Sequence, residues 1–250
     1  DELILISCNF NDYTELPGLP GQRNIVVLDQ NLNQLQEFLP VQFKGTYNNN
    51  PIISDIDGDG KNEIIIASGE GLVDNISTVE IFGHTGAFQK RLSYSDSAEY
   101  TGPLSMAVAD VDGDSNPEIL MSLKGNIHAV NYETGLNIEG YPVKGGYYFA
   151  VGDIDGGSDT EVVTFLEDPL GDEQDNLNIM AVYRDDGTLV DLDIVIDYSG
   201  RYEAEIMPMI VDFDLDGRNE VVVAGNYWEG KFEAVPQLWV FDFGGEDHEP

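Results

Sequence analysis

A short acidic segment occurs four times in this chain and constrains its fold more than any other feature. The copies read DIDGDGKNEIII, DVDGDSNPEILM, DIDGGSDTEVVT and DFDLDGRNEVVV, and they begin at Asp55, Asp110, Asp153 and Asp212. Each has Asp at positions 1 and 3, Asp or Gly at position 5 and Glu at position 9, followed by three mostly apolar or β-branched residues. A pattern that returns every 43 to 59 residues is typical of a protein built from structural repeats.

Strand-like segments separate these acidic turns. Apolar residues alternate with polar ones and run into tight turns, as in VEIFGHTGAFQKRL from Val79 and IMAVYRDDGTLVDL from Ile179. Turns of this composition join the strands of β-hairpins. Because no segment shows a convincing 3.6-residue apolar period, the sequence predicts an all-β protein.

Each repeat reads as four antiparallel strands, with the acidic turn between the first strand and the second. In the repeat that contains Asp55 the predicted strands are 52–54, 64–68, 78–82 and 88–94. Four strands in 45 to 60 residues is the size of one propeller blade. The predicted fold is therefore a β-propeller of four-stranded antiparallel blades, with about five blades represented and the first and last incomplete.

The predicted organisation is a single propeller region, 1–250, that forms part of a longer protein. The segment that begins at Asp1 corresponds to the one that begins at Asn62, so the first blade lacks its first strand, and the last blade stops near Gly244. We expect an open arc that further blades or a partner chain complete, with a closed five-bladed ring as the alternative. The predicted blades are 1–45, 46–98, 99–145, 146–200 and 201–250.

Acidic residues far outnumber basic ones. The chain has 47 Asp and Glu against 11 Lys and Arg, a formal net charge of −36. Such a protein repels nucleic acid and anionic membranes, and no run nears the roughly 18 apolar residues of a membrane helix. The excess acid fits the solvated surface of a halophilic or marine protein, a calcium binder, or both. The single cysteine, Cys8, excludes an intrachain disulfide.

The repeated part of this acid has the chemistry of a calcium site. Calcium takes six to eight oxygen ligands, and a turn with carboxylates at positions 1, 3 and 5 curls them around a central ion. Carboxylates this close repel one another unless a cation neutralises them. Glycine at position 6, as at Gly60 and Gly217, permits the positive φ that the curl requires.

An EF-hand begins in the same way but requires an acidic residue at position 12 and a following helix. Here a predicted strand follows each turn, and position 12 carries no acid in any copy. The four residues at position 12 are Ile66, Met121, Thr164 and Val223. The EF-hand interpretation therefore fails at all four copies.

The Asp-x-Asp-x-Asp-Gly-x-x-Glu turn between blade strands resembles the FG-GAP/VCBS repeat family, which includes the calcium-binding blades of integrin α-subunit propellers. As repeated architecture the resemblance covers essentially the whole chain, and it is most specific at the turns. It implies calcium bound by three carboxylates, the main-chain carbonyl at position 7 and the Glu at position 9. The implied ligands are Asp55, Asp57, Asp59, Lys61 and Glu63; Asp110, Asp112, Asp114, Asn116 and Glu118; and Asp212, Asp214, Asp216, Arg218 and Glu220.

The third turn departs from this pattern. Asp153, Asp155 and Glu161 are in place, but position 5 is Gly157 and a new carboxylate, Asp159, stands at position 7. Either Asp159 replaces the missing ligand, or water does, or the site is weak. The sequence therefore predicts three to four calcium ions, and a metal-free acidic β-turn is the alternative at each copy.

No catalytic constellation stands out in the sequence. The expected function is a non-catalytic binding or adhesion module of a secreted or cell-surface protein, with a protein or carbohydrate ligand. The alternative is the substrate-binding propeller of a secreted polysaccharide-degrading enzyme such as a lyase. The candidate binding loops are 69–77, 167–178 and 225–235, in which Tyr227 and Trp228 either stack on a ligand or pack against a neighbouring blade.

Overall fold

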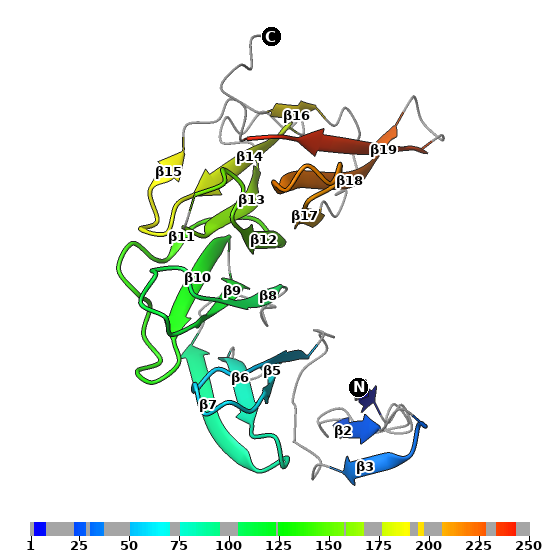
Figure 1. Ribbon diagram of the computed structural model, residues 1–250, viewed down its shortest axis with the longest axis vertical. Helices are drawn as coiled ribbons and strands as arrows, with labels where there is room; N and C mark the ends of the chain where they lie inside the picture. Colours follow the sequence, from blue (N-terminus) through cyan, green and yellow to red (C-terminus); the bar gives the residue numbers. More distant parts are fainter. Residues whose placement is uncertain are drawn as a thin grey trace. The chain divides into compact units, whose positions relative to one another are not determined.

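All regular elements in the described part of the chain are β-strands, and they form five antiparallel sheets (Figure 1). The all-β prediction is therefore confirmed for these residues, and none of them belongs to a helix that could cross a membrane. The structure is a computed structural model that describes residues 3–8, 23–28, 31–37, 51–70, 76–95, 105–123, 125–157, 159–167, 177–190, 195–197, 207–228 and 234–243. The chain divides into two compact units, Asp1–Met106 and Ala107–Pro250.

The first unit contains two sheets. The first sheet has the order β1-β2-β3 and consists of β1 (Leu3–Cys8), β2 (Arg23–Leu28) and β3 (Gln34–Glu37). The second has the order β4-β5-β6-β7 and consists of β4 (Ile52–Ser54), β5 (Glu63–Glu70), β6 (Ile76–Phe82) and β7 (Phe88–Ser95).

The second sheet has the four strands predicted for its repeat, in the predicted order. The hairpin between β5 and β6 is longer than expected, because pairing continues to Glu70 opposite Ile76. The prediction of a loop at 69–77 is therefore wrong for the residues that the structure describes, all of which belong to β5 or β6. The alternation of apolar and polar residues along β6 sustains this pairing.

The third sheet has the order β11-β10-β9-β8. It consists of β8 (Met106–Ala109), β9 (Glu118–Leu123), β10 (Asn126–Asn131) and β11 (Val143–Lys144). The fifth has the order β17-β18-β19 and consists of β17 (Met207–Val211), β18 (Glu220–Trp228) and β19 (Ala234–Phe241).

The fourth sheet has an outer edge made of two short strands. Both β15 and β16 pair with β14, at its end and its start respectively, so together they occupy the place of one fourth strand. The strands are β12 (Phe149–Gly152), β13 (Glu161–Glu167), β14 (Leu177–Tyr183), β15 (Leu189–Val190) and β16 (Val195–Asp197).

The prediction of a loop at 225–235 is wrong for the residues of this segment that the structure describes. The hairpin of β18 and β19 continues through Tyr227 opposite Val235 and Trp228 opposite Ala234, because β-branched and aromatic residues favour strand pairing. The side chains of Tyr227 and Trp228 lie outside what the structure describes, as does most of the predicted loop 167–178.

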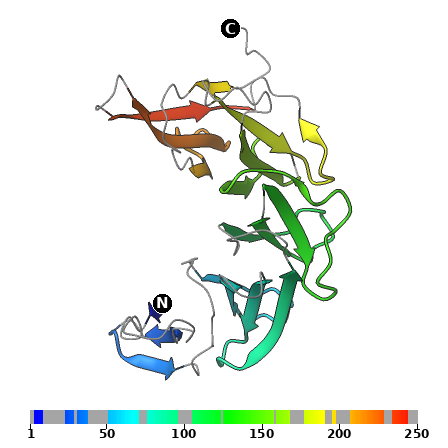
Figure 2. The same ribbon diagram turned by 180° about the vertical axis from the view of Figure 1, so that it is seen from behind.

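Successive sheets of the second unit pack face to face, in chain order (Figure 2). The fourth sheet uses alternate residues of β13 for its two neighbours: Val162 lies in the core shared with the third sheet, and Val163 lies in the core shared with the fifth. This division follows from the two-residue period of a β-strand. The three acidic turns of the second unit therefore lie at the ends of strands in sheets that pack on a neighbouring sheet.

Candidate metal centres

Each acidic turn connects the first strand of a sheet to the second. The turns join β4 to β5, β8 to β9, β12 to β13 and β17 to β18, and the Glu at position 9 is the first residue of the second strand. The strand register places Ser54 opposite Glu63 and Val211 opposite Glu220. Strand pairing thus carries the Glu into the sheet while the aspartates remain in the turn, and a strand follows where an EF-hand has a helix.

The Glu at position 9 closes each turn by accepting a hydrogen bond from the backbone N–H at position 2. All four glutamates are buried, with at most 5% of their surface exposed. The four bonds are Ile56 N to Glu63 Oε2 (3.2 Å), Val111 N to Glu118 Oε2 (3.1 Å), Ile154 N to Glu161 Oε2 (3.0 Å) and Phe213 N to Glu220 Oε2 (2.6 Å). One carboxylate oxygen is used in this way, and the other remains for a further interaction.

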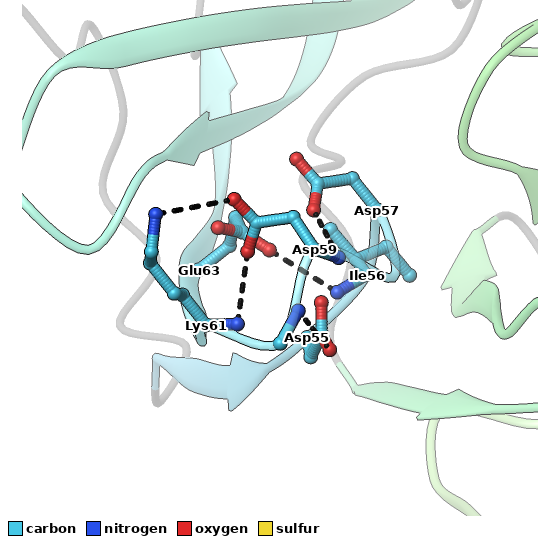
Figure 3. Close-up of polar contacts among 7 residues, drawn as sticks. Asp55, Ile56, Asp57, Asp59, Lys61 and Glu63 are labelled. Carbon is cyan, nitrogen blue, oxygen red and sulfur yellow. Dashed lines mark hydrogen bonds and ion pairs between the residues drawn. The ribbon is translucent and has the colours of Figure 1, made fainter.

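The carboxylates at positions 1, 3 and 9 converge in every turn, as Figure 3 shows for the first. In each group, one oxygen from each of the three side chains lies within 4.8 Å of the others. The groups are Asp55, Asp57 and Glu63; Asp110, Asp112 and Glu118; Asp153, Asp155 and Glu161; and Asp212, Asp214 and Glu220.

Backbone N–H groups hold the aspartates of an intact turn in place. In the first turn Asp57 Oδ1 accepts from Asp59 N (3.1 Å), and Asp55 Oδ2 accepts from Gly60 N (2.9 Å). The corresponding bonds form in the second and fourth turns. The backbone of the turn therefore holds one oxygen of each of these aspartates in place.

Several of the remaining oxygens are buried without a hydrogen-bond partner. They are Asp55 Oδ1, Glu63 Oε1, Asp110 Oδ1, Glu118 Oε1 and Asp212 Oδ1, all in the three intact turns. A buried carboxylate oxygen without a partner is costly, and most such atoms in proteins are satisfied. A cation at the centre of the loop supplies that partner, so the residues present fit a bound metal ion.

Without a cation, the buried glutamates hold a proton more readily than an ordinary carboxylate does. Burial raises the pKa of Glu118 to about 7; the backbone hydrogen bond lowers it, and the surrounding aspartates raise it further. Burial likewise raises the pKa values of Glu63 and Glu161. Metal binding favours the deprotonated carboxylate and opposes this shift.

The carboxylates at position 5 lie outside the convergent groups. Asp59, which is exposed, accepts from Lys61 N at 2.9 Å, and the Lys61 Nζ lies 3.6 Å from Asp59 Oδ2. Asp114 and Asp216 accept in the same way from the backbone N–H of Asn116 and Arg218. Of the predicted side-chain ligands, those at positions 1, 3 and 9 are thus brought together, and those at position 5 support the backbone of the turn.

Position 4 of each turn also has the left-handed backbone conformation, which was not predicted from the sequence. Position 4 has positive φ in all four turns, and position 6 has it in the three turns where the structure describes that residue, including Ser115 at 72°. Position 4 includes Leu215 at 66°, a conformation that costs an L-residue roughly 1–2 kcal/mol. Glycine at position 4 of the other three turns was the available signal. Those glycines are Gly58, Gly113 and Gly156.

The third turn keeps the hydrogen bond from the position-5 N–H to the position-3 carboxylate, but its position-1 carboxylate accepts from position 4 and not from position 6. Asp153 Oδ1 accepts from Gly156 N (2.8 Å), and Asp155 Oδ1 accepts from Gly157 N (2.8 Å). Asp159 is exposed and lies outside the convergent group. The Asn219 side chain, from the next turn, donates to the Asp153 carbonyl at 2.8 Å. The third turn is thus stabilised by a hydrogen bond from the fourth turn. It lacks a carboxylate at position 5, which is Gly157.

We expect Gly157→Asp to tighten metal binding at the third turn by about tenfold, through one charge-assisted backbone contact of the kind that Asp59 makes. A Cβ at Gly157 would lie 2.8 Å from Asp155 Oδ1, the atom that accepts from Gly157 N, so the Asp155 carboxylate must shift slightly to make room while it keeps its place in the convergent group. Titration calorimetry with calcium measures the change, and Gly157→Asn is the matched uncharged control. Equal affinity of the Asp and Asn variants would show that charge at position 5 does not matter here.

The comparisons with known proteins agree with this geometry. Residues 55–121 match the FG-GAP-like repeat family, over a segment that holds the first two acidic turns. The crystal structure of the V. cholerae biofilm matrix protein Bap1 is similar, with a TM-score of 0.54 and 18% identity over 98% of this chain and 38% of that chain. This chain thus spans less than two fifths of Bap1, and no curated protein matches it. The resemblance inferred from the acidic turns is confirmed over residues 55–121, which match the FG-GAP-like repeat family.

Proposed function

We propose that this chain is a calcium-stabilised extracellular β-propeller that acts as a non-catalytic binding or adhesion module. The observation that carries the proposal is the set of buried, unpartnered carboxylate oxygens that converge in the intact turns. The match of residues 55–121 to the FG-GAP-like repeat supports the same interpretation. The ligand is a protein or a carbohydrate, and neither nucleic acid nor membrane insertion is involved.

The donor set favours calcium over other metals. Each convergent group offers carboxylate oxygens, whereas zinc prefers His and Cys ligands. Calcium accepts six to eight oxygens in tolerant geometry, and magnesium demands a near-ideal octahedron. The proposal is three to four ions. The proposed side-chain ligands are first the convergent carboxylates: Asp55, Asp57 and Glu63; Asp110, Asp112 and Glu118; Asp153, Asp155 and Glu161; and Asp212, Asp214 and Glu220. Asp59, Asp114, Asp159 and Asp216, which lie outside these groups, are proposed to turn toward the ion when it binds, and the carbonyls of Lys61, Asn116 and Arg218 complete the set.

The role of calcium in this proposal is structural. An ion in each turn fixes the connection between the first two strands of a sheet and neutralises three carboxylates held close together. The chain has only one cysteine, so no intrachain disulfide can stabilise these connections between strands. When bound, calcium supplies neutralisation and coordination, and the chain's own backbone N–H groups orient the carboxylates.

The propeller arrangement is proposed from the repeat and from the packing of successive sheets. In the second unit each sheet packs on the next, as the blades of a propeller do. The five sheets are proposed to be blades of one region, 1–250, within a longer protein. The similarity of this chain to the fold of a biofilm matrix protein supports an extracellular location and an adhesive role.

The test of function is binding to immobilised polysaccharides and bacterial surface proteins, with the chain loaded with calcium. We expect retention without depolymerisation, and loss of retention in excess chelator because the blades loosen. Product formation from the same polysaccharides, followed by reducing ends and by absorbance of unsaturated sugars, would support the alternative of a degrading enzyme. If a chelator leaves retention unchanged, ligand binding does not depend on the calcium sites.

A further inference from the structure

The hydrogen bond from Asn219 to Asp153 joins two of the candidate metal centres. The Asn219 side chain donates from Nδ2 to the Asp153 carbonyl at 2.8 Å, between residues that are 66 positions apart in the sequence. Asn219 is position 8 of the fourth turn, and Asp153 is position 1 of the third. The contact therefore leads from one convergent group of carboxylates to the next.

Both chain neighbours of Asn219 belong to the fourth centre. Glu220, on one side, is a convergent carboxylate that is 5% exposed and accepts from Phe213 N. Arg218, on the other side, is proposed to supply its carbonyl to the ion. An ion at the fourth turn therefore fixes the backbone on both sides of Asn219, and with it the direction of the Asn219 side chain. Without the ion, the three convergent carboxylates repel one another and loosen this segment.

Asp153 receives the hydrogen bond at a place that the fifth sheet already borders. Gly152, before it, lies so close to β17 that a Cβ there would be 3.0 Å from Ile210 Cγ2. Ile154, after it, is 3% exposed and lies in the core shared with the fifth sheet, together with Val221. Of these contacts, only the hydrogen bond to Asp153 starts between two proposed ligands of the fourth ion. It is therefore the contact that responds to an ion at the fourth turn.

The third turn has fewer internal contacts than an intact turn, so support from outside matters more to it. Position 5 is Gly157, and the bond that Asp59 accepts from Lys61 N in the first turn has no counterpart there. The Asp153 carboxylate accepts from position 4 and not from position 6. A hydrogen bond that holds the Asp153 backbone thus positions the first ligand of the turn with the weakest set of carboxylates.

The other acidic turns lack this connection. Position 8 is Asn62 in the first turn, Pro117 in the second and Thr160 in the third. The side chain of proline has no donor. Asn62 is exposed, and among the residues that the structure describes neither its amide nor the Thr160 hydroxyl donates to another acidic turn. The connection is therefore particular to the third and fourth turns.

We propose that Asn219 couples the third and fourth calcium sites, so that an ion bound at either one tightens binding at the other. Asn219 is a positioning residue, because it acts through the backbone of Asp153 and is not itself a proposed ligand. One hydrogen bond shifts an equilibrium by about fivefold, and the coupling has the same size in both directions. This inference rests on the proposed function, since it requires calcium at both turns.

The test is calcium titration calorimetry of the whole chain in a background in which Asp57→Ala and Asp112→Ala remove the first and second sites. We expect two ions to bind in this background. Asp214→Ala then leaves the third site alone, and its dissociation constant should be about fivefold higher than when the fourth site is filled. Asp155→Ala leaves the fourth site alone and should weaken it by the same factor.

Asn219→Leu is the decisive variant, because leucine keeps the volume of the side chain and lacks the donor. We expect both ions still to bind, with a third-site dissociation constant that no longer depends on whether Asp214→Ala has emptied the fourth site. Asn62→Leu, at the same position of the first turn, is the matched control and keeps the coupling. Coupling that persists in Asn219→Leu, or no coupling before this substitution is made, would overturn the proposal.

Hydrogen exchange in singly substituted chains gives a second readout that does not require the multiply substituted chain to fold. In millimolar calcium, Asp214→Ala and Asn219→Leu should each speed exchange of the Ile154 N–H, which donates to Glu161, by about fivefold, because the third turn opens when its ion leaves. Asp57→Ala should leave this rate unchanged. An unchanged rate in the first two variants would contradict the coupling. A chain that binds no calcium would instead be a failure of the proposed function, whereas two ions bound independently would overturn the coupling alone.

Discussion

We expect calcium to raise the melting temperature of this protein by tens of degrees over its value in excess chelator, which is the largest effect that the proposal predicts. Each site filled at roughly 100 times its dissociation constant adds about 2.7 kcal/mol to the free energy of unfolding. Three intact turns together add about 8 kcal/mol, and in a chain of this size each kcal/mol shifts the melting temperature by roughly 2–4 °C. Differential scanning calorimetry measures the shift.

Magnesium at the same concentration is the control for this melting experiment. Its strict octahedral geometry and reluctance to dehydrate predict a much smaller shift than calcium gives. Sodium chloride at matched ionic strength controls for screening of the net charge of −36. Equal melting temperatures in excess chelator and in millimolar calcium would contradict a structural role for calcium.

The second large effect is that we expect Glu118→Gln to lower the free energy of unfolding when calcium is present and to raise it when calcium is removed. With calcium present, the variant loses one ion and about 2.7 kcal/mol of stability. In chelator at pH 8 it is more stable than the parent chain, because it removes a buried charge beside Asp110 and Asp112. The folded pKa of Glu118, about 7, lies above its ordinary 4.5, so its stabilising contribution below pH 4.5 is lost as the pH rises through about 7.

Urea denaturation at pH 8, with and without calcium, measures both halves of this prediction. Glu139→Gln is the matched control, since Glu139 is exposed and lies outside the acidic turns. We expect it to change stability by less than about 0.5 kcal/mol in either condition. A Glu118→Gln variant that is destabilised equally with calcium and with chelator would show that Glu118 acts only through its hydrogen bond to Val111.

The acidic turns and the strands beside them could be predicted from sequence because both are local signals. The turn pattern fixes the first and second strands of a sheet, and β4 to β7 follow the predicted segments closely. The length of the hairpin between β18 and β19 could not be predicted, because Gly225 and Asn226 look like turn residues and only cross-strand pairing overrides them.

The residue types at the centre of the site could be predicted from the sequence, but the contacts that each carboxylate makes could not. Positions 1, 3, 5 and 9 all carry acid in an intact turn, and the pattern alone does not say which oxygens face a backbone N–H and which face the ion. That depends on the left-handed residues at positions 4 and 6, of which Leu215 gives no signal in the sequence. The brace from Asn219 to the third turn is a long-range contact that no local pattern contains.

The most direct test of the calcium sites is the number of calcium ions bound per chain, measured by equilibrium dialysis with elemental analysis. We expect three to four ions in the parent chain. Asp57→Ala removes one carboxylate from the first convergent group and should lower the number by one, and Asp214→Ala should do the same at the fourth turn. A parent chain that binds no calcium, or variants that bind as many ions as the parent, would contradict the assignment of these turns as calcium sites.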